Sequence, residues 1–115
     1  MHEWIDHALW GLDRGQPLVL VSVGWVQGST PREAGAKLLV SDVRQWCTIG
    51  GGHLEWMAVD IARKRLGTAP GQTPDRWVER LPLGPSLGQC CGGMVHLLFE
   101  RLHIEDRVWI EALRQ

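Results

Sequence analysis

The spacing of hydrophobic residues divides the chain into helical and extended segments. Apolar residues at helical spacing predict helices over residues 3–14, 54–66 and 106–113. Branched apolar runs, or alternation of polar with apolar residues, predict strands over residues 18–26, 36–40, 45–49, 76–81 and 94–102. Several strands follow one another through short turns. This order favours an α+β fold, a single domain with a mixed sheet of about five strands flanked by two or three helices.

Two of these segments have a distinctive composition. Residues 18–26 are apolar with little alternation, which is typical of a strand buried on both faces. Residues 68–75 contain two prolines, one glycine and two threonines, so we expect an exposed connection there. With 115 residues, of which 44% are hydrophobic, the chain is long enough for one compact domain.

Charge and composition exclude several classes of protein. The net charge is −1, with 12 basic and 13 acidic residues mixed along the chain, so neither nucleic acid nor an acidic membrane surface is an expected partner. No apolar run approaches the roughly 20 residues that cross a bilayer, and the first ten residues lack the pattern of a secretory signal. We therefore expect a cytoplasmic protein. Its exposed tryptophans make a homo-oligomer a further expectation.

The cysteines indicate neither a disulfide framework nor a structural zinc site. There are three, an odd number, and no Cys-x-x-Cys spacing occurs. Cys47 lies inside a predicted strand, so we expect it in the core. Cys90 and Cys91 are adjacent in the glycine-rich sequence LGPSLGQCCGG, residues 83–93. Glycines leave such thiols uncrowded, and thiolates are nucleophiles and soft metal ligands.

Two further segments suggest anion binding. In TIGGGHLE, residues 48–55, a strand passes through Gly50, Gly51 and Gly52 into a helix, where backbone N–H groups can converge on a phosphate. A tight turn that needs positive φ angles explains the same glycines equally well. His53 can offer a proton or a hydrogen bond near neutral pH. Glu55 fits best as a charge or cap at the helix N-terminus.

The remaining segment, GSTPREAGAK, covers residues 28–37. Pro31 restricts this loop, which would position Arg32 for a bidentate contact to phosphate or carboxylate. A salt bridge from Arg32 to Glu33 or another acid is the alternative. Lys37, on the following strand, is expected to be a charge at the sheet edge.

Together the three segments resemble the amino-terminal domain of the XdhC/CoxI family, over roughly residues 18–102. These accessory factors mature xanthine dehydrogenase and related molybdenum hydroxylases. The resemblance implies a chaperone, a carrier more than a catalyst, which binds the molybdenum cofactor (molybdopterin) as cargo. It supports sulfuration of this cargo by a cysteine desulfurase and delivers it to the dehydrogenase. The cofactor-binding residues that it implies are Ser29, Arg32, Gly50, Gly51, Gly52, His53, Gln89, Cys90 and Cys91.

Within that set, Arg32 and the glycine amides would hold the phosphate, and Cys90 or Cys91 would approach the molybdenum or its sulfido ligand. Family members usually continue into a carboxy-terminal dinucleotide-type domain. This chain has neither the length nor the Gly-x-Gly-x-x-Gly fingerprint for one. Two other functions stay open. One is a sulfurtransferase-like carrier with a persulfide on Cys90 or Cys91 and His53 as acid or base. The other is a docking domain without a ligand site.

Overall fold

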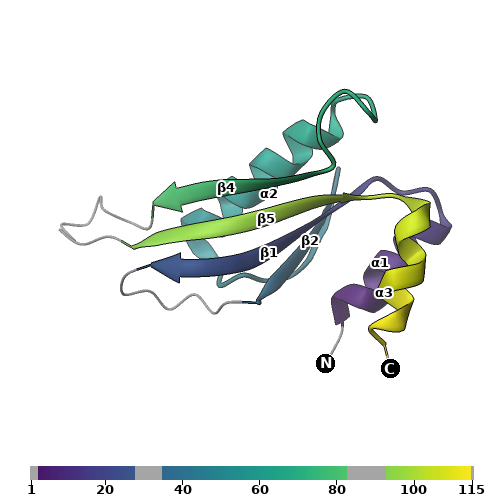
Figure 1. Ribbon diagram of the computed structural model, residues 1–115, viewed down its shortest axis with the longest axis horizontal. Coiled ribbons are helices and arrows are strands. Elements are labelled where there is room, and N and C mark those ends of the chain that lie inside the picture. Colours follow the sequence, from purple (N-terminus) through teal and green to yellow (C-terminus); the bar gives the residue numbers. More distant parts are fainter. Residues whose placement is uncertain (1–2, 28–34, 83–92, 115) are drawn as a thin grey trace.

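The fold is known from a computed structural model, which describes residues 3–27, 35–82 and 93–114. Three helices and five strands occur in these ranges (Figure 1). In chain order they are α1 (Glu3–Asp13), β1 (Leu18–Gln27), β2 (Lys37–Ser41), β3 (Gln45–Cys47), α2 (Gly52–Leu66), β4 (Arg76–Pro82), β5 (Met94–Leu102) and α3 (Arg107–Ala112). A short 3-10 turn, Ile104–Asp106, precedes α3. The expected single α+β domain and all of its predicted elements are confirmed.

The strands form one sheet in the order β3-β2-β1-β5-β4. All four pairings between the described strands are antiparallel, so the expectation of a mixed sheet is wrong in this respect. The reason lies in the position of β5. Helix α2 carries the chain from β3 to β4, which runs in the same direction as β1. Strand β5 then inserts between β1 and β4 and separates the two strands that would have paired in parallel.

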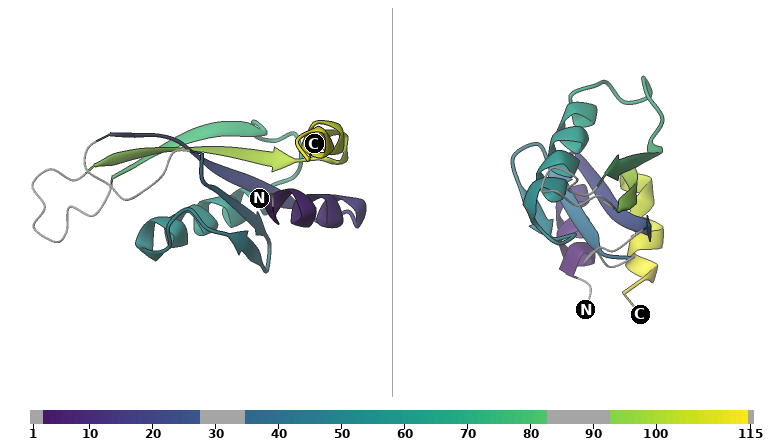
Figure 2. Two further views of the ribbon diagram at one scale, coloured as in Figure 1. Left: turned by 90° about the horizontal axis from the view of Figure 1, so that it is seen from below. Right: turned by 90° about the vertical axis from the view of Figure 1, so that its left-hand side faces the viewer.

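Strand β1 is buried on both faces, as its composition predicts. Val19, Val21 and Val23 belong to the core cluster that packs against α2. Leu18 and Leu20, which alternate with them, belong to a second cluster with residues of α1 and α3. Figure 2 shows α2 on one side of the strands and α3 on the other. The continuous apolar run of β1 therefore supplies both cores of the domain.

Helices α1 and α3 lie side by side at one end of the molecule (Figure 1). The rings of Trp4 and Trp109 are 6.3 Å apart, and Nε of Arg107 lies 2.7 Å from Oδ1 of Asp13. The hydrogen bond from the Arg107 guanidinium holds the pKa of the Asp13 carboxyl below its usual value. These contacts join the two ends of the described chain. No helix among the described residues is long and apolar enough to cross a membrane.

Candidate functional site

The three sequence segments of interest all follow strands that run in the same direction. Strand β1 is antiparallel to β2, which is antiparallel to β3, and β1 is likewise related to β4 through β5. The C-terminal ends of β1, β3 and β4 therefore point to one end of the sheet, which we call the motif end. There Met94 of β5 pairs with both Gln27 of β1 and Pro82 of β4. The segments 28–34 and 83–92 thus start from neighbouring strand ends.

The glycine segment forms a tight turn from β3 into α2. Gly50, Gly51 and Gly52 have φ angles of 118°, 75° and 69°, which residues with a Cβ rarely adopt. A Cβ at Gly51 would meet no atom within 4 Å, so backbone conformation and not crowding requires glycine there. The interpretation of the triplet as a turn that needs positive φ is therefore confirmed.

Glu55 fastens this turn from within the first turn of α2. Its Oε1 accepts hydrogen bonds from the backbone N–H of Ile49 and of Gly51, both at 3.1 Å, and from the Thr48 hydroxyl at 2.5 Å. Its Oε2 accepts a bond from the Gln45 side chain at 3.1 Å. Glu55 therefore has the structural role that its position at the helix start indicates. Its partners Gln45 and Thr48 carry no signal in the sequence.

This arrangement bears directly on phosphate binding. Donors of the turn converge on one anionic oxygen, which is the chemistry expected of a helix N-terminus. In this conformation, however, the anion is the chain's own carboxylate. The N–H of Gly50 is also engaged, because it donates to the Thr48 hydroxyl at 2.9 Å. A phosphate would have to displace Glu55 to reach these donors, so its binding here stays a prediction.

His53 is exposed at the start of α2, where its ring stacks on that of Trp56. The two ring centroids are 5.7 Å apart and the planes are inclined by 14°. Both side chains are exposed to solvent, so a partner or ligand can reach them. Among the described ranges, His53 is thus the predicted site residue with an accessible side chain.

The other predicted site residues lie outside the described residues. They are Ser29, Arg32, Gln89, Cys90 and Cys91. In the ranges that are described, no group of three or more His, Cys, Asp or Glu side chains is placed to hold a metal ion.

Cys47 is exposed, so the expectation that it lies in the core is wrong. Strand β3 has only three residues and lies at the edge of the sheet, and its middle residue, Trp46, turns toward the core. Cys47 therefore faces outward, with a φ of 69°. Partial desolvation raises the pKa of its thiol, and the carboxylate of Glu3 adds to the increase. Lys37 lies at the start of β2, just before the residues that pair with β3, and the Lys37 ammonium donates to the Ser22 hydroxyl at 3.0 Å.

One feature of the motif end was missed in the sequence, a stack of Trp25 on His96. The ring centroids are 4.0 Å apart and the planes are inclined by 18°. The register of β1 shifts between Val23 and Trp25, where Gly24 is the extra residue of a bulge. An isolated glycine inside a strand pattern is the available signal for such a bulge. A Cβ on Gly24 would lie 3.3 Å from the His96 carbonyl oxygen.

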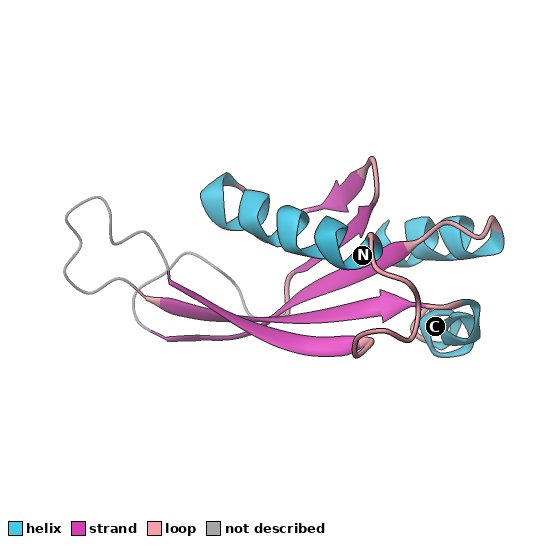
Figure 3. Ribbon diagram, turned by 90° about the horizontal axis from the view of Figure 1, so that it is seen from above, coloured by secondary structure: helices cyan, strands magenta, loops and turns pink. Residues whose placement is uncertain are grey.

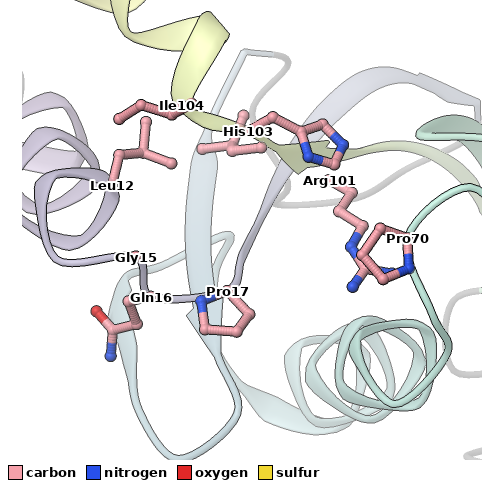
Figure 4. Close-up of a pocket in the computed structure, with 9 residues that line it drawn as sticks. Leu12, Gly15, Gln16, Pro17, Pro70, Arg101, His103 and Ile104 are labelled. Atoms are coloured by element: carbon pink, nitrogen blue, oxygen red, sulfur yellow. The ribbon is translucent and has the colours of Figure 1, made fainter.

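A cavity of about 230 Å³ lies at the opposite end of the sheet, near the start of β1 and the end of β5 (Figure 4). Pro17, Pro70, Arg101 and His103 are among its lining residues. Nη1 of the buried Arg101 donates to the carbonyl oxygen of Thr68 at 3.1 Å. The same nitrogen donates to the Arg65 carbonyl at 3.2 Å, which caps the C-terminus of α2. The main polar group of this cavity thus fastens a helix, away from the motif end.

The chain is similar to known proteins in two comparisons. The sequence pattern of the XdhC and CoxI family matches residues 11–74. A crystal structure described as a xanthine dehydrogenase from Bacillus halodurans superposes with a TM-score of 0.73 and 25% sequence identity. The likeness covers 96% of this chain and 32% of that one, so the chain spans about a third of its length. No curated protein matches the sequence.

The family match extends from the end of α1 to the connection before β4. It therefore includes the segments 28–37 and 48–55 but not the cysteine-containing segment 83–93. The similar structure extends the likeness over almost the whole sheet, since it covers 96% of the chain. Because the pattern matches more than half of the 115 residues, the chain belongs to the XdhC and CoxI family.

Proposed function

We propose that this domain binds the molybdenum cofactor as cargo and serves in the maturation of a xanthine dehydrogenase or a related molybdenum hydroxylase. The observation that carries the proposal is the common direction of β1, β3 and β4. In each of these strands the chain runs toward the motif end before it enters a segment; β1 and β4 end level with Met94, and β3 ends level with Val21 of β1. Membership of the XdhC and CoxI family and the likeness to a protein described as a xanthine dehydrogenase support the same function.

The chemistry of the segments suits such a cargo. Arg32 would hold its phosphate with a planar guanidinium. Cys90 or Cys91 would approach the molybdenum or its terminal sulfur, because thiolates are soft ligands. Ser29, Gln89 and His53 would add hydrogen bonds. While Glu55 accepts the hydrogen bonds of the glycine turn, this turn would form one wall of the binding site.

The molybdenum is the reactive centre of the recipient enzyme, so the domain needs only to hold, shield and release it. A cysteine desulfurase would supply the sulfur while the cargo is bound. A carrier also needs no metal site of its own, so the proposal does not depend on a resident ion.

The test is retention of the cargo during gel filtration. We expect molybdenum, measured by mass spectrometry of the metal, to coelute with the purified protein after incubation with cofactor released from a molybdoenzyme. Cys90→Ala, Cys91→Ala and Arg32→Ala should each reduce the retained molybdenum. Cys47→Ala is the matched control, because Cys47 is an exposed thiol on β3. Retention unchanged in all three variants would overturn the proposed site, and no retention by the wild-type protein would overturn the function.

A further inference from the structure

One part of the sheet surface at the motif end is not covered by a helix. The cluster formed with α1 and α3 includes Leu18 and Leu20 of β1 but does not include Trp25, which lies on the same face further toward the motif end. Trp25 is 51% exposed and Val78 is 50% exposed. Figure 3 shows that α1 and α3 lie at the other end of the long strands. An apolar and aromatic surface therefore stays accessible beside the segments of interest.

Trp25 reaches this face because of the bulge at Gly24. Val21 and Val23 point into the cluster beneath α2, and strict alternation would send Trp25 to the same side. The extra residue reverses the alternation, so Trp25 pairs with His96 and shares its face. The bulge at Gly24 thus places the indole of Trp25 on the face of the sheet opposite α2.

The indole of Trp25 stacks on the ring of a buried histidine. His96 is 6% exposed, and its Nδ1 is buried with no hydrogen-bond partner among the described residues. Leaving a buried polar atom unpaired is unfavourable, and such an atom in a native structure calls for an explanation. The His96 ring stacks on the indole, with the ring centroids 4.0 Å apart, so it covers one face of Trp25 while the side chain of Trp25 stays half exposed.

The charge around the platform is positive. Arg80 of β4 lies directly across from His96, so Arg80, His96 and Trp25 form one row over three strands. Arg80 is exposed and forms no ion pair with any described residue. The nearby Arg76 is paired with Glu100 at 3.0 Å. An exposed cation without an ion-pair partner among the described residues therefore lies in the same row as Trp25, with His96 between the two.

From this geometry we infer that Trp25, supported by His96, is a stacking platform for a planar heteroaromatic ring, and that Arg80 binds an anionic group attached to that ring. An indole face stacks on planar heteroaromatic rings, and a guanidinium binds anionic groups. The identification of the ring as a pterin rests on the proposed function. The platform itself rests on the stack, the bulge and the position of Arg80.

The experiment measures binding of two probes, pterin-6-carboxylate and uncharged pterin, by titration calorimetry. Trp25→Ala should weaken binding of both probes by about ten-fold or more, the loss expected when one stacking partner is removed. Arg80→Ala should weaken only the carboxylate probe. Trp25→Phe should restore most of the binding, because phenylalanine keeps an aromatic face.

Trp10→Ala is the matched control, since Trp10 is 53% exposed but lies on α1, at the other end of the sheet. It should bind both probes as the wild-type protein does. Wild-type binding by a folded Trp25→Ala variant, or no binding of either probe to the wild-type protein, would overturn the platform. A change in oligomeric state with unchanged probe binding would overturn it in favour of a contact between copies of the chain.

The two proposals fail in different ways. Retained molybdenum in the gel-filtration test together with unchanged probe affinity in Trp25→Ala would refute the platform and leave the carrier function standing. Probe binding that depends on Trp25, in a protein that retains no molybdenum, would establish the platform and refute the carrier function.

Discussion

The face of the sheet beneath α2 and the motif end differ in how their side chains are used. Beneath α2, Val21, Leu97 and Phe99 are fully buried and belong to one continuous cluster. At the motif end, Trp25 is exposed, His96 has a ring nitrogen without a partner among the described residues, and a carboxylate fills the glycine turn. The first region has the features of a core built for stability. The second keeps polar and aromatic groups whose arrangement stability alone does not explain.

This contrast implies that substitutions in the two regions have different consequences. A change beneath α2 should destabilise the whole domain, because packing there is shared by every central strand. A change at the motif end should act locally, because the groups involved are exposed or bonded within one turn. Three experiments test this separation.

The largest effect is expected for Phe99→Ala. Phe99 is fully buried and its ring stacks on Trp77 at 5.1 Å. Removing a buried aromatic ring costs about 3–5 kcal/mol of unfolding free energy. For a domain of this size that lowers Tm by roughly 12 °C or more, measurable by circular dichroism. Val108→Ala, at a position that is 79% exposed, should change the free energy by less than about 0.5 kcal/mol. Equal losses in the two variants would contradict the location of the core.

An intermediate effect is expected for Glu55→Gln. The variant removes the negative charge that accepts bonds from Ile49, Gly51 and Thr48. Hydrogen bonds to charged groups contribute about 1.5–3 kcal/mol, so we expect a loss of unfolding free energy toward the lower end of that range. Denaturation in urea measures the loss.

Hydrogen exchange gives this variant a second readout. Exchange at the amides of Ile49 and Gly51 should become faster, while the amides of β5 stay protected. The control is Glu105→Gln, since Glu105 is exposed in the 3-10 turn before α3. If Glu55→Gln also accelerates exchange throughout β5, the motif end is not energetically separate from the core.

The smallest effect on the fold is expected at Cys47, where the sensitive quantity is reactivity. The raised pKa of its thiol leaves less thiolate near neutral pH than in an ordinary cysteine, whose pKa is about 8.5. Alkylation of Cys47 by iodoacetamide, followed by peptide mass spectrometry, should therefore reach half of its maximal rate at a higher pH than alkylation of glutathione. A midpoint at or below that of glutathione would show that desolvation and Glu3 do not act on this thiol.

Much of the fold could be predicted because the pattern of apolar residues within each segment indicates a helix or a strand. The uninterrupted apolar run of β1 predicts burial on both faces, and the positions of Leu18 and Val19 in different clusters confirm it. Glu55 was assigned correctly, because a carboxylate in the first turn of a helix has few competing roles. Cys47 was assigned wrongly, because strand propensity does not say which strand forms the edge of a sheet.

The candidate site was predictable only in part. The glycine triplet was found from its composition, but the donors around Glu55 depend on how β3 enters α2. The Trp25–His96 stack joins residues that are 71 positions apart in the sequence, and it depends on a bulge. No short sequence pattern can predict such a pairing.

By itself, the sequence determined the elements, their order and the three segments that carry polar chemistry, because periodicity and glycine content are local properties of the chain. Only the tertiary structure decided the strand order, the edge position of Cys47 and the shared direction of β1, β3 and β4. The edge position of Cys47 follows from the pairing of β3 with β2, and the direction of β4 follows from β5 returning between β1 and β4. That choice is made by long-range packing on both faces of β1, which has no counterpart in any short stretch of sequence.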